Sequence, residues 1–509
     1  MPDSRDPAVK RSTVPPKNPS RREVLRAVAG IGAVAVAAPL SAPQDAEAFG
    51  KSTTASGPLA PVRYRLALSK EDMAPVGRPQ GALVVNGVLP APEIRFREGF
   101  LLRTEVINGL EQPTAFHFHG LPVPNPMDGE IGITQLPIRP GNVSIYEFPA
   151  AEPGTYWYHS TVGFQRQLGL AGAFVVEERE NPYGTKRDQV VFLSDWETGD
   201  PAAVLSGLRK RGGKPKASTH ERFVNPGPDG KPFPSEVNFS AFLMNGHGHG
   251  NAWTCKAAEG DRVRLRVING SSQTFFRFMV TGHRLEVVAA DGRAVEPVVV
   301  DDLVIGIGER YDVIVTVGEQ GAYAIRAAAL GQSGGAVGVL HTPDAKPVVS
   351  TVPPRWEGER LRYDMLRAKE PRTLPEGPRR NLRISLAEVP GEYRYTINGK
   401  SFPEDPTAGT APGPLRIQPG ERVRMEIDNK TSQFQSMHLH GHVFRLLLDG
   451  VDPAVAPRKD TLIVAPGERT HLEFAADNPG RWLLDSVALY RRRAGLARVV
   501  AYLAGTATI

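Results

Sequence analysis

The chain has 509 residues, which is enough for several domains of ordinary size. Its composition, with 40% hydrophobic and 23% charged residues, is that of a globular protein with enough apolar residues to build buried cores. The formal net charge of +6 is small for this length, and the sequence contains no basic stripe with interleaved aromatic residues. A nucleic-acid partner is therefore not indicated.

The first 48 residues resemble a twin-arginine signal peptide. A polar, basic lead runs into residues 20–26 (SRREVLR), an apolar run follows at 27–40, and residues 46–48 (AEA) offer a cleavage site. The alternatives are a membrane anchor or a core helix, but the apolar run is too short to span a membrane comfortably. We therefore expect export in the folded state, to the periplasm or outside the cell. No transmembrane segment is expected after removal of the signal, and residues 49–61 are expected to form a linker.

Three copies of one sequence unit follow, at intervals of about 160 residues. Each copy contains an Asn-Gly pair, then two stretches in which polar and apolar residues alternate, and finally a segment that starts with glycine. The Asn-Gly pairs begin at Asn86, Asn245 and Asn398. The first alternating stretches are 101–109, 262–270 and 422–429, the second are 144–148, 311–317 and 470–474, and the glycine segments are 154–159, 321–326 and 480–485. Alternation is typical of a strand with one buried face, so each copy is predicted to consist of short strands.

The repeat predicts an all-β fold. Short strands, abundant glycine and proline and few helical patterns indicate that each unit is an antiparallel sandwich or barrel, with a few turns of helix near residues 201–211. The predicted units are 62–180, 188–345 and 379–509, with a proline-rich linker at 346–378. Cys255, the one cysteine, leaves no internal disulfide and is predicted to be a small buried residue.

Two pairs of histidines with the spacing His-x-His stand far apart in the chain. The first pair is His117 with His119, and the second is His438 with His440. Residues two apart in a strand point to the same face, so each pair directs two imidazoles into one place. Two such pairs in matching units predict one nitrogen-rich metal site, and imidazole suits copper and zinc better than calcium or magnesium. The alternative is that these are surface or hydrogen-bonded histidines.

A third His-x-His pair, His247 with His249, has glycine on both sides. Glycines in this arrangement predict a turn rather than a strand, so the two imidazoles are not fixed on one face. The pair is therefore considered only as an accessory copper site.

Four motifs carry a resemblance to a known family. They are 116–121 (FHFHGL), 127–129 (MDG), 154–160 (GTYWYHS) and 437–441 (MHLHG). With the threefold repeat they resemble the multicopper oxidases, over nearly all of the mature chain. This resemblance implies three cupredoxin-like Greek-key β-sandwich domains. The middle unit, with VFLSDW at 191–196, looks most like the bacterial copper-resistance oxidases, although their methionine-rich stretches are missing.

The resemblance implies two copper centres. In this family a type 1 copper, held by Cys, two His and often an axial Met, passes electrons to a trinuclear cluster held by eight His, where dioxygen is reduced. His117 and His438 match the ligands of the type 2 copper. His119 and His159 match two ligands of one type 3 copper, and His440 matches one ligand of the other.

Two acidic residues belong to the same implied site. Asp485 stands at a ligand position of the cluster where the family has histidine. Asp128, in the MDG motif, is either an acid that acts on bound water beside the ligands or a turn residue before Gly129. Three or four nitrogen and oxygen ligands suffice for a mononuclear Cu(II) or Zn(II) site with an open position.

The other ligand positions of the family carry residues that do not bind copper well. They are Thr161, Gln435, Ser486, Val487, Arg491 and Leu496. A serine hydroxyl does not replace a thiolate, and Arg491 brings a permanent cation to the place of the type 1 copper. We therefore expect fewer than four copper ions, with zinc as an alternative metal, and no laccase or cuprous-oxidase turnover. Residues 491–493 (RRR) are a solvated charge run, a docking patch or a filler of the type 1 pocket.

Three functions fit these features. The first is an exported copper-binding protein of copper homeostasis, or one with a limited redox role, that uses a partial type 2/type 3 site. The alternative is a metal-free scaffold that binds envelope proteins and acts in envelope integrity or cell division. The third is an enzyme that uses the remaining metal as a Lewis acid or a single-copper redox centre.

Overall fold

The Asn-Gly pair of each repeated unit forms a tight turn in the computed structural model. The asparagines Asn86, Asn245 and Asn398 have φ of 52°, 50° and 52°, and the glycine that follows each of them also has a positive φ. Two positive φ angles in succession define a type I′ turn, which only Asn, Asp and Gly adopt readily. Each asparagine side chain also bonds the backbone of the first strand of its unit, as Asn86 Oδ1 does by accepting from the Ala67 amide at 2.8 Å. The turn therefore fixes the register in all three units.

The structure describes residues 61–150, 152–213, 225–227, 230–349, 356–409 and 411–503. The signal peptide expected at 1–48 lies outside these residues, and so do residues 49–60 of the expected linker and residues 350–355 of the proline-rich linker. Among the described residues no helix is long and apolar enough to cross a membrane.

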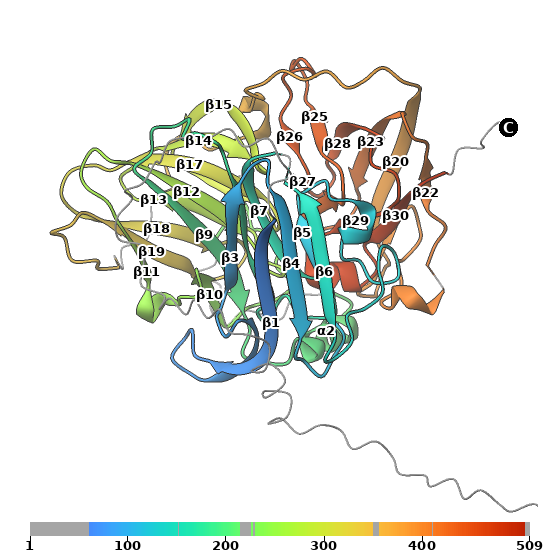
Figure 1. Ribbon diagram of the computed structural model, residues 1–509, viewed down its shortest axis with the longest axis horizontal. Helices are drawn as coiled ribbons and strands as arrows, with labels where there is room; N and C mark the ends of the chain where they lie inside the picture. Colours follow the sequence, from blue (N-terminus) through green and yellow to red (C-terminus); the bar gives the residue numbers. More distant parts are fainter. Residues whose placement is uncertain are drawn as a thin grey trace, which may run out of the picture. The chain divides into compact units, whose positions relative to one another are not determined.

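The first unit consists of two four-stranded sheets (Figure 1). One sheet has the order β2 (Gln80–Val85), β1 (Val62–Met73), β4 (Leu101–Asn108) and β6 (Val143–Pro149). The other has the order β3 (Ala91–Arg97), β8 (Ala171–Glu177), β7 (Gly154–Ser160) and β5 (Phe116–His119). Side chains from both sheets, including Leu66, Phe118 and Phe174, share one hydrophobic core, so the unit is a β-sandwich.

The second unit consists of a six-stranded and a five-stranded sheet. The larger sheet has the order β10 (Ala241–Met244), β9 (Arg187–Trp196), β12 (Arg262–Asn269), β17 (Arg310–Thr316), β14 (Leu285–Ala290) and β15 (Arg293–Val300). The smaller has the order β11 (Trp253–Lys256), β19 (Gly335–His341), β18 (Ala322–Ala329), β13 (Phe276–Val280) and β16 (Leu303–Ile305). Cys255 lies buried in the core between them, as predicted.

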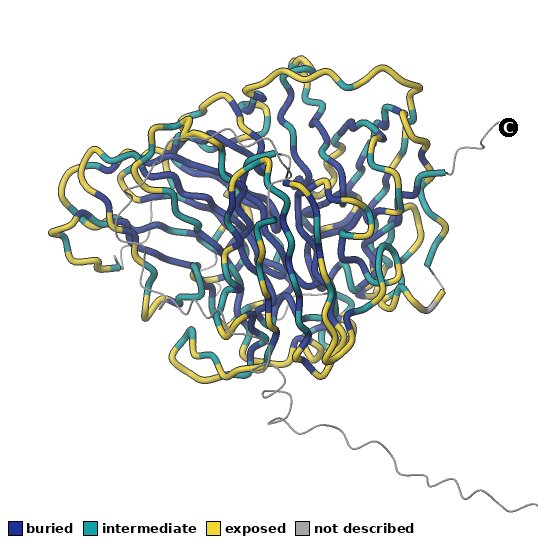
Figure 2. Tube along the Cα trace, viewed as in Figure 1, coloured by how far each residue is buried: buried dark blue, intermediate teal, exposed yellow. Residues whose placement is uncertain are grey.

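The third unit repeats the arrangement of the second. Its six-stranded sheet has the order β21 (Tyr395–Ile397), β20 (Arg379–Glu388), β23 (Arg422–Asn429), β28 (Arg469–Ala475), β25 (Phe444–Leu447) and β26 (Arg458–Lys459). Its five-stranded sheet has the order β22 (Leu415–Ile417), β30 (Ala497–Tyr502), β29 (Arg481–Ser486), β24 (Gln435–Leu439) and β27 (Thr461–Val464). Figure 2 shows that the strands of the three sandwiches are largely buried, whereas the connecting loops are exposed.

Helices occupy few of the described residues. The helix expected near 201–211 is confirmed as α2 (Pro201–Lys210), whose first turn is capped by Asp200 accepting from the Ala202 amide. The other helical segments are α3 (Leu489–Arg493) and the short 3₁₀ turns η1 (Asn125–Met127), η3 (His249–Asn251), η4 (Tyr363–Met365) and η5 (Pro406–Ala408). The all-β prediction is thus confirmed.

The expectation of purely antiparallel sheets is wrong in one respect. Each sandwich contains two parallel pairs, of which one joins its first strand to its long central strand: β1 with β4, β9 with β12, and β20 with β23. The second parallel pairs are β3 with β8, β11 with β19 and β22 with β30. Alternation along a strand reports which face is buried and carries no information on the direction of the neighbouring strand. The mixed sheets were therefore not visible in the sequence pattern.

Arg310, at the start of β17, joins all three sandwiches. Its side chain is fully buried, and its Nη1 and Nη2 each donate to a carboxylate oxygen of Asp460 at 2.7 Å. Its Nε donates to the backbone carbonyl of Thr155 in the first sandwich at 3.0 Å. Lys459, next to Asp460, pairs with Asp291 and Glu309 of the second sandwich at 3.0 Å each. A buried charge is tolerated only when it is paired and hydrogen-bonded, so this network requires the sandwiches to be closed.

Glu152, in the loop before β7, forms a second link between the sandwiches. Its carboxylate accepts from Arg293 Nε of β15 at 3.2 Å, from Arg372 Nη1 at 3.2 Å and from Arg458 Nη2 of β26 at 3.0 Å. Burial alone raises the pKa of Glu152, but the arginines outweigh it and lower the pKa from 4.5 to about 2. A carboxylate whose pKa is lower in the folded chain stabilises the fold above its unfolded pKa, and this contribution is lost as the pH falls towards the folded pKa.

We predict that Glu152→Gln lowers the melting temperature at pH 7 by about 2 °C, and that this difference shrinks between pH 5 and pH 3. The substitution removes the charge that the three arginines share. As the pH falls below 4.5, protons bind the carboxyl of the unfolded chain before that of the folded chain, so this charge stabilises the wild type less. Thermal unfolding followed by circular dichroism at several pH values measures the difference. Glu147→Gln is the control, because Glu147 pairs with Arg103 inside the first sandwich at a more exposed position. A difference that stays constant with pH contradicts the prediction.

Candidate metal centre

The two His-x-His pairs lie together between the first and third sandwiches. His117 and His119 are on β5, His438 is on β24, and His440 follows β24 directly. His159 lies on β7, where it is the register partner of His117. All five side chains are at most 4% exposed. Strand alternation therefore does place each pair on one face, and both faces meet.

Three of these imidazoles present Nε2 to the centre of the cluster. The Nδ1 atoms of His117, His438 and His159 lie 2.8 to 3.0 Å from the backbone carbonyls of Asp128, Asp460 and Ser160. A carbonyl only accepts, so each Nδ1 carries the proton and each Nε2 keeps its lone pair. The Nε2 atoms of His117 and His438 are 3.3 Å apart, and Nε2 of His159 is buried without a hydrogen-bond partner among the described residues. Lone pairs arranged in this way fit a shared cation.

Gly129 allows the first of these contacts. It has φ of +87°, and a Cβ at this position would lie 1.9 Å from the carbonyl oxygen of Phe116 on β5. Only glycine lets the MDG loop pass this close to β5, which brings the Asp128 carbonyl onto His117 Nδ1. The MDG motif therefore contributes a backbone contact as well as the Asp128 carboxylate.

His119 is held differently. Its Nε2 lies 2.8 Å from Thr461 Oγ1 and 3.4 Å from Asp460 Oδ1. These two contacts engage Nε2 and do not involve the other ring nitrogen, Nδ1. Its ring stacks on His438, with 3.7 Å between centroids, and the buried Trp157 lies 4.9 Å from His119 and 4.2 Å from His159. The indole therefore forms one wall of the cluster.

His117, His119 and His159 are electrically neutral at neutral pH. Burial, followed by the charges of neighbouring histidines, lowers the pKa of His117 from 6.5 to about 4. Burial is also the main cause that holds the pKa values of His119 and His159 well below 6.5. Neutral imidazole is the form that binds a metal ion, so these side chains need to release no proton on binding.

His440 has an acidic environment instead. Its Nδ1 is 3.2 Å from both oxygens of Asp128, and its Nε2 is 3.6 Å from Asp485 and 4.0 Å from Glu130. Burial lowers the pKa of His440, but Asp128 and then Asp485 outweigh it and raise the pKa to about 10. His440 is therefore an imidazolium at neutral pH. Asp128 thus contacts the cluster directly, and it also lies 3.2 Å from His117 Nδ1.

Three groups of side chains have donor atoms close enough together to hold one ion. They are His117 with His438 and His440, His117 with His119 and His159, and His119 with His438 and Asp460, with all donor atoms in each group within 4.8 Å of one another. The five predicted histidines are thus brought together, and Asp485, the register partner of His438, places its carboxylate 3.6 Å from His440 Nε2.

The sequence reasoning missed Asp460, Glu130 and Arg492. Asp460 orients His438 through its backbone and contacts His119 through its carboxylate. Glu130 and Arg492 form an ion pair of 2.6 Å beside Asp485. Two features of the sequence could have pointed to these residues. Asp460 is a charged residue directly before the apolar strand β27, and Glu130 is an acid directly after the MDG motif. Neither signal has the spacing of a ligand motif.

The positions assigned to the type 1 centre by resemblance lie around the Arg491 guanidinium. Its Nε donates to Glu236 of the second sandwich at 2.9 Å, and its Nη atoms reach Gln433 at 3.2 Å and Gln435 at 3.5 Å. Ser486 Oγ donates to Gln435 Oε1 at 3.3 Å, and Leu496 lies in the core of the third sandwich. The side chain of Arg491 is 3% exposed, so of the three interpretations of residues 491–493 the filler fits Arg491.

The two remaining substituted positions are also engaged by the protein. Thr161 Oγ1 donates to the carbonyl of Gly129 at 2.8 Å. Val487 packs in a hydrophobic cluster with Trp157, and its carbonyl accepts from Arg166 Nη2 at 2.6 Å. Both side chains are short, and neither offers a nitrogen ligand to the cluster.

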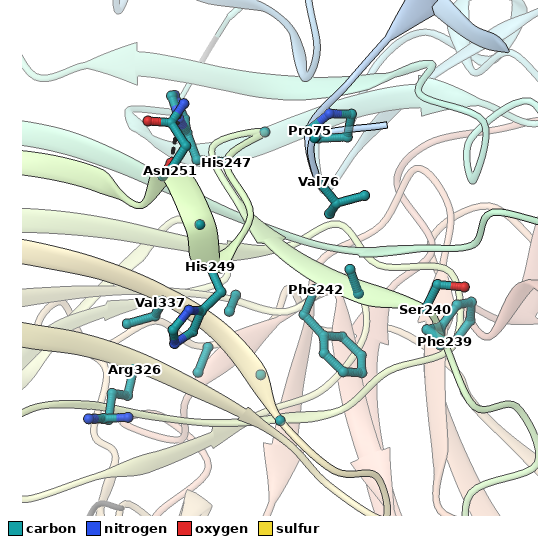
Figure 3. A pocket seen from close by; sticks show the side chains of 18 of the residues that line it. Pro75, Val76, Phe239, Ser240, Phe242, His247, His249, Asn251, Arg326 and Val337 are labelled. Atoms are coloured by element: carbon teal, nitrogen blue, oxygen red, sulfur yellow. Dashed lines mark hydrogen bonds between the residues drawn. The ribbon is translucent and has the colours of Figure 1, made fainter. Parts of the chain in front are cut away.

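The third histidine pair does not converge. His247 Nδ1 is 3.0 Å from the Asn251 carbonyl, and His249 begins the turn η3. Both residues line a cavity of about 970 Å³, and in Figure 3 the ring of His249 lies away from His247 and nearer to Val337. The predicted turn is confirmed, and the two imidazoles are not arranged as ligands of one ion.

Comparison with known proteins gives the family. Models described as multicopper oxidase match residues 67–181, 187–344 and 385–505. The multicopper oxidase MmcO of Mycobacterium tuberculosis is 31% identical over 439 residues, which cover 83% of each chain. A copper resistance protein A homolog of Pseudomonas syringae pv. tomato is 28% identical over an alignment 555 residues long, which covers 87% of this chain and 92% of the relative.

Solved structures show the same fold. The laccase from Botrytis aclada superimposes with a TM-score of 0.72 at 25% identity, covering 88% of this chain and 89% of the laccase. The multicopper oxidase Fet3p, which functions in iron import, superimposes with a TM-score of 0.73 at 22% identity, covering 87% and 90% of the two chains. Three matched segments in succession and a relative of 31% identity over most of its length show that the chain belongs to the multicopper oxidase family.

Proposed function

We propose that this protein is an exported copper-binding member of the multicopper oxidase family that lacks type 1 copper. It serves copper homeostasis or a limited redox role rather than laccase turnover. The observation that carries the proposal is the set of three imidazoles whose Nδ1 atoms donate to carbonyls, which leaves three buried Nε2 lone pairs. Two such atoms 3.3 Å apart and a third without a partner are unfavourable unless a cation lies between them.

The donor set suits copper. It consists of imidazoles, with His117, His119, His159 and His438 on one side and the imidazolium of His440 with Asp485 on the other. Imidazole selects copper, zinc and other late transition metals, so zinc is the competing ion. A bound copper supplies a Lewis acid or a one-electron centre at this site. The protein's own contribution is to fix the imidazole tautomers, to hold the carboxylates Asp128 and Asp460 beside them, and to exclude water.

The absence of a type 1 copper is proposed from Arg491. A permanent cation that is buried and paired with Glu236 occupies the place where the family has copper, and no thiolate is available at Ser486. Without that centre, electrons from a reducing substrate have no route to the histidine cluster. Fewer than four copper ions are therefore bound.

Metal analysis tests copper binding. We predict that the protein retains at least one copper ion per chain after loading with Cu(II) and desalting, with a type 2 electron paramagnetic resonance signal and a raised melting temperature. The double variant His117→Ala, His438→Ala is expected to retain less than about a tenth of this copper, because it removes both facing Nε2 atoms. His471→Ala, on the partly exposed side of β28, is the control and is expected to behave as the wild type. Copper-free wild type with an unchanged melting temperature contradicts the proposal.

Oxidase assays test the missing type 1 centre. The copper-loaded protein is expected to show no intense blue absorption, and its dioxygen consumption with phenols or cuprous ion as the reductant is expected to equal that of the double histidine variant. Stopped-flow absorption and an oxygen electrode measure these quantities. Turnover above that background would show that electrons reach the cluster by another route.

Export is proposed from the twin-arginine motif of residues 20–26, and it agrees with a copper-resistance relative. We predict that Arg21→Lys with Arg22→Lys retains the folded protein in the cytoplasm, whereas the wild type reaches the periplasm or the medium. Cell fractionation and immunoblotting measure the distribution, and Lys17→Arg is the control for a change of basic residue in the same segment. Wild-type export by the double variant contradicts this route.

A metal-free scaffold for envelope proteins is the alternative function, and it is favoured by the ion pairs that fill the positions around Arg491. In that case alanine at His117, His119, His438 and His440 together leaves the cellular role intact as long as the variant folds. Loss of the role in a folded quadruple variant contradicts the scaffold.

A further inference from the structure

The cluster is divided into a histidine side and an acidic side. The histidine side contains His117, His119, His159 and His438. On the acidic side, His440 is surrounded by the carboxylates of Asp128, Asp485 and Glu130, the last of which is 3% exposed. The proposed copper site accounts for the first side, whereas on the acidic side three buried carboxyl groups share one imidazole, which contacts none of them closer than 3.2 Å.

Arg492, on α3, supplies the missing positive charge. Its Nη2 donates to Glu130 Oε2 at 2.6 Å, and its Nε is 3.0 Å from Asp485 Oδ2. Glu130 belongs to the first sandwich, whereas Asp485 and Arg492 belong to the third. The guanidinium therefore bridges the interface at the place where the two carboxylates approach His440.

The remaining oxygens of these carboxylates have the spacing of metal ligands. Asp485 Oδ1 is 3.6 Å and Glu130 Oε1 is 4.0 Å from His440 Nε2. Two donor atoms bound to one ion at about 2.1 Å lie roughly 3 to 4 Å apart. Glu130 Oε1 is also buried without a hydrogen-bond partner among the residues that the structure describes. An unpaired carboxylate oxygen at this spacing points to a cation site beside His440.

This side of the cluster is reached from solvent. A cleft of about 390 Å³ between the first and third sandwiches is lined by Glu130, Thr161 and Arg492 among other residues. Ions can therefore reach the outer edge of this side, where Glu130 and Arg492 line the cleft. The cation already there is Arg492, whose charge is permanent and repels a second cation at the same carboxylates.

We propose, on the basis of the copper site above, that the Arg492 guanidinium stands in for a second metal ion and limits the centre to one ion on the histidine side. Its removal converts His440, Asp485 and Glu130 into a second site for a divalent cation that accepts mixed imidazole and carboxylate ligands, such as Zn(II) or Cu(II). Arg492 is thus the residue that determines the metal stoichiometry of this chain.

The test is the number of ions bound by Arg492→Gln. After loading with Cu(II), and separately with Zn(II), and desalting, mass spectrometry is expected to find about one ion per chain in the wild type and about two in the variant. With copper, a second resonance component with fewer nitrogen couplings accompanies the second ion. Arg493→Gln is the matched control, because Arg493 is the adjacent arginine and pairs with Glu404 away from the cluster. It is expected to bind one ion.

Each outcome decides the proposal separately from the function. A folded Arg492→Gln variant that binds as many ions as the wild type overturns it, and so does a wild type that already binds two. A wild type without metal and a variant with one ion would refute the copper site above and support the role of Arg492. If Arg492→Gln does not fold, Arg492→Met decides, because it removes the same charge and keeps an unbranched side chain: about two bound ions support the proposal, and one bound ion overturns it.

Discussion

The geometry of the histidine cluster depends on one buried ion pair, between Arg310 and Asp460. Arg310 belongs to the second sandwich, Asp460 to the third, and the Nε of the same guanidinium reaches the backbone of the first. Asp460 also accepts from His438 through its carbonyl and lies 3.4 Å from His119 through its carboxylate. One residue thus closes the three sandwiches and orients imidazoles from two of them. Removal of either partner leaves a buried charge with only longer contacts, Arg310 with Asp291 at 3.5 Å or Asp460 with Arg293 at 3.4 Å, so closure and ligand geometry are weakened together.

The short helix α3 links the third sandwich to the other two through buried ion pairs. Arg491 binds Glu236 of the second sandwich, and the next residue, Arg492, binds Glu130 of the first. Two consecutive cations therefore reach two different sandwiches from the third. These buried ion pairs therefore help to hold the three sandwiches together at α3.

The sequence predicted the structure correctly wherever a feature depends on a short local pattern of residues. The Asn-Gly turns, the alternating strands and the His-x-His pairs each depend on two to eight consecutive residues, and the structure places them as expected. Parallel pairing joins strands that are far apart in the sequence, and the Arg310–Asp460 pair and the contact of Glu130 with Arg492 join residues 150 or more positions apart. No local spacing identifies such partners, because any buried acid can be matched with any of several arginines. The histidines were thus predictable, whereas the charges that orient and neutralise them were not.

The indole of Trp157 gives the centre an optical property of its own. It is fully buried and lies within van der Waals distance of the rings of His159 and His119. A paramagnetic Cu(II) ion held by these imidazoles quenches the excited state of an indole at this distance, whereas diamagnetic Zn(II) does not. When the proposed site is loaded with metal, the fluorescence of Trp157, one of five tryptophans in the chain, is therefore expected to fall with Cu(II) and not with Zn(II), without any added label.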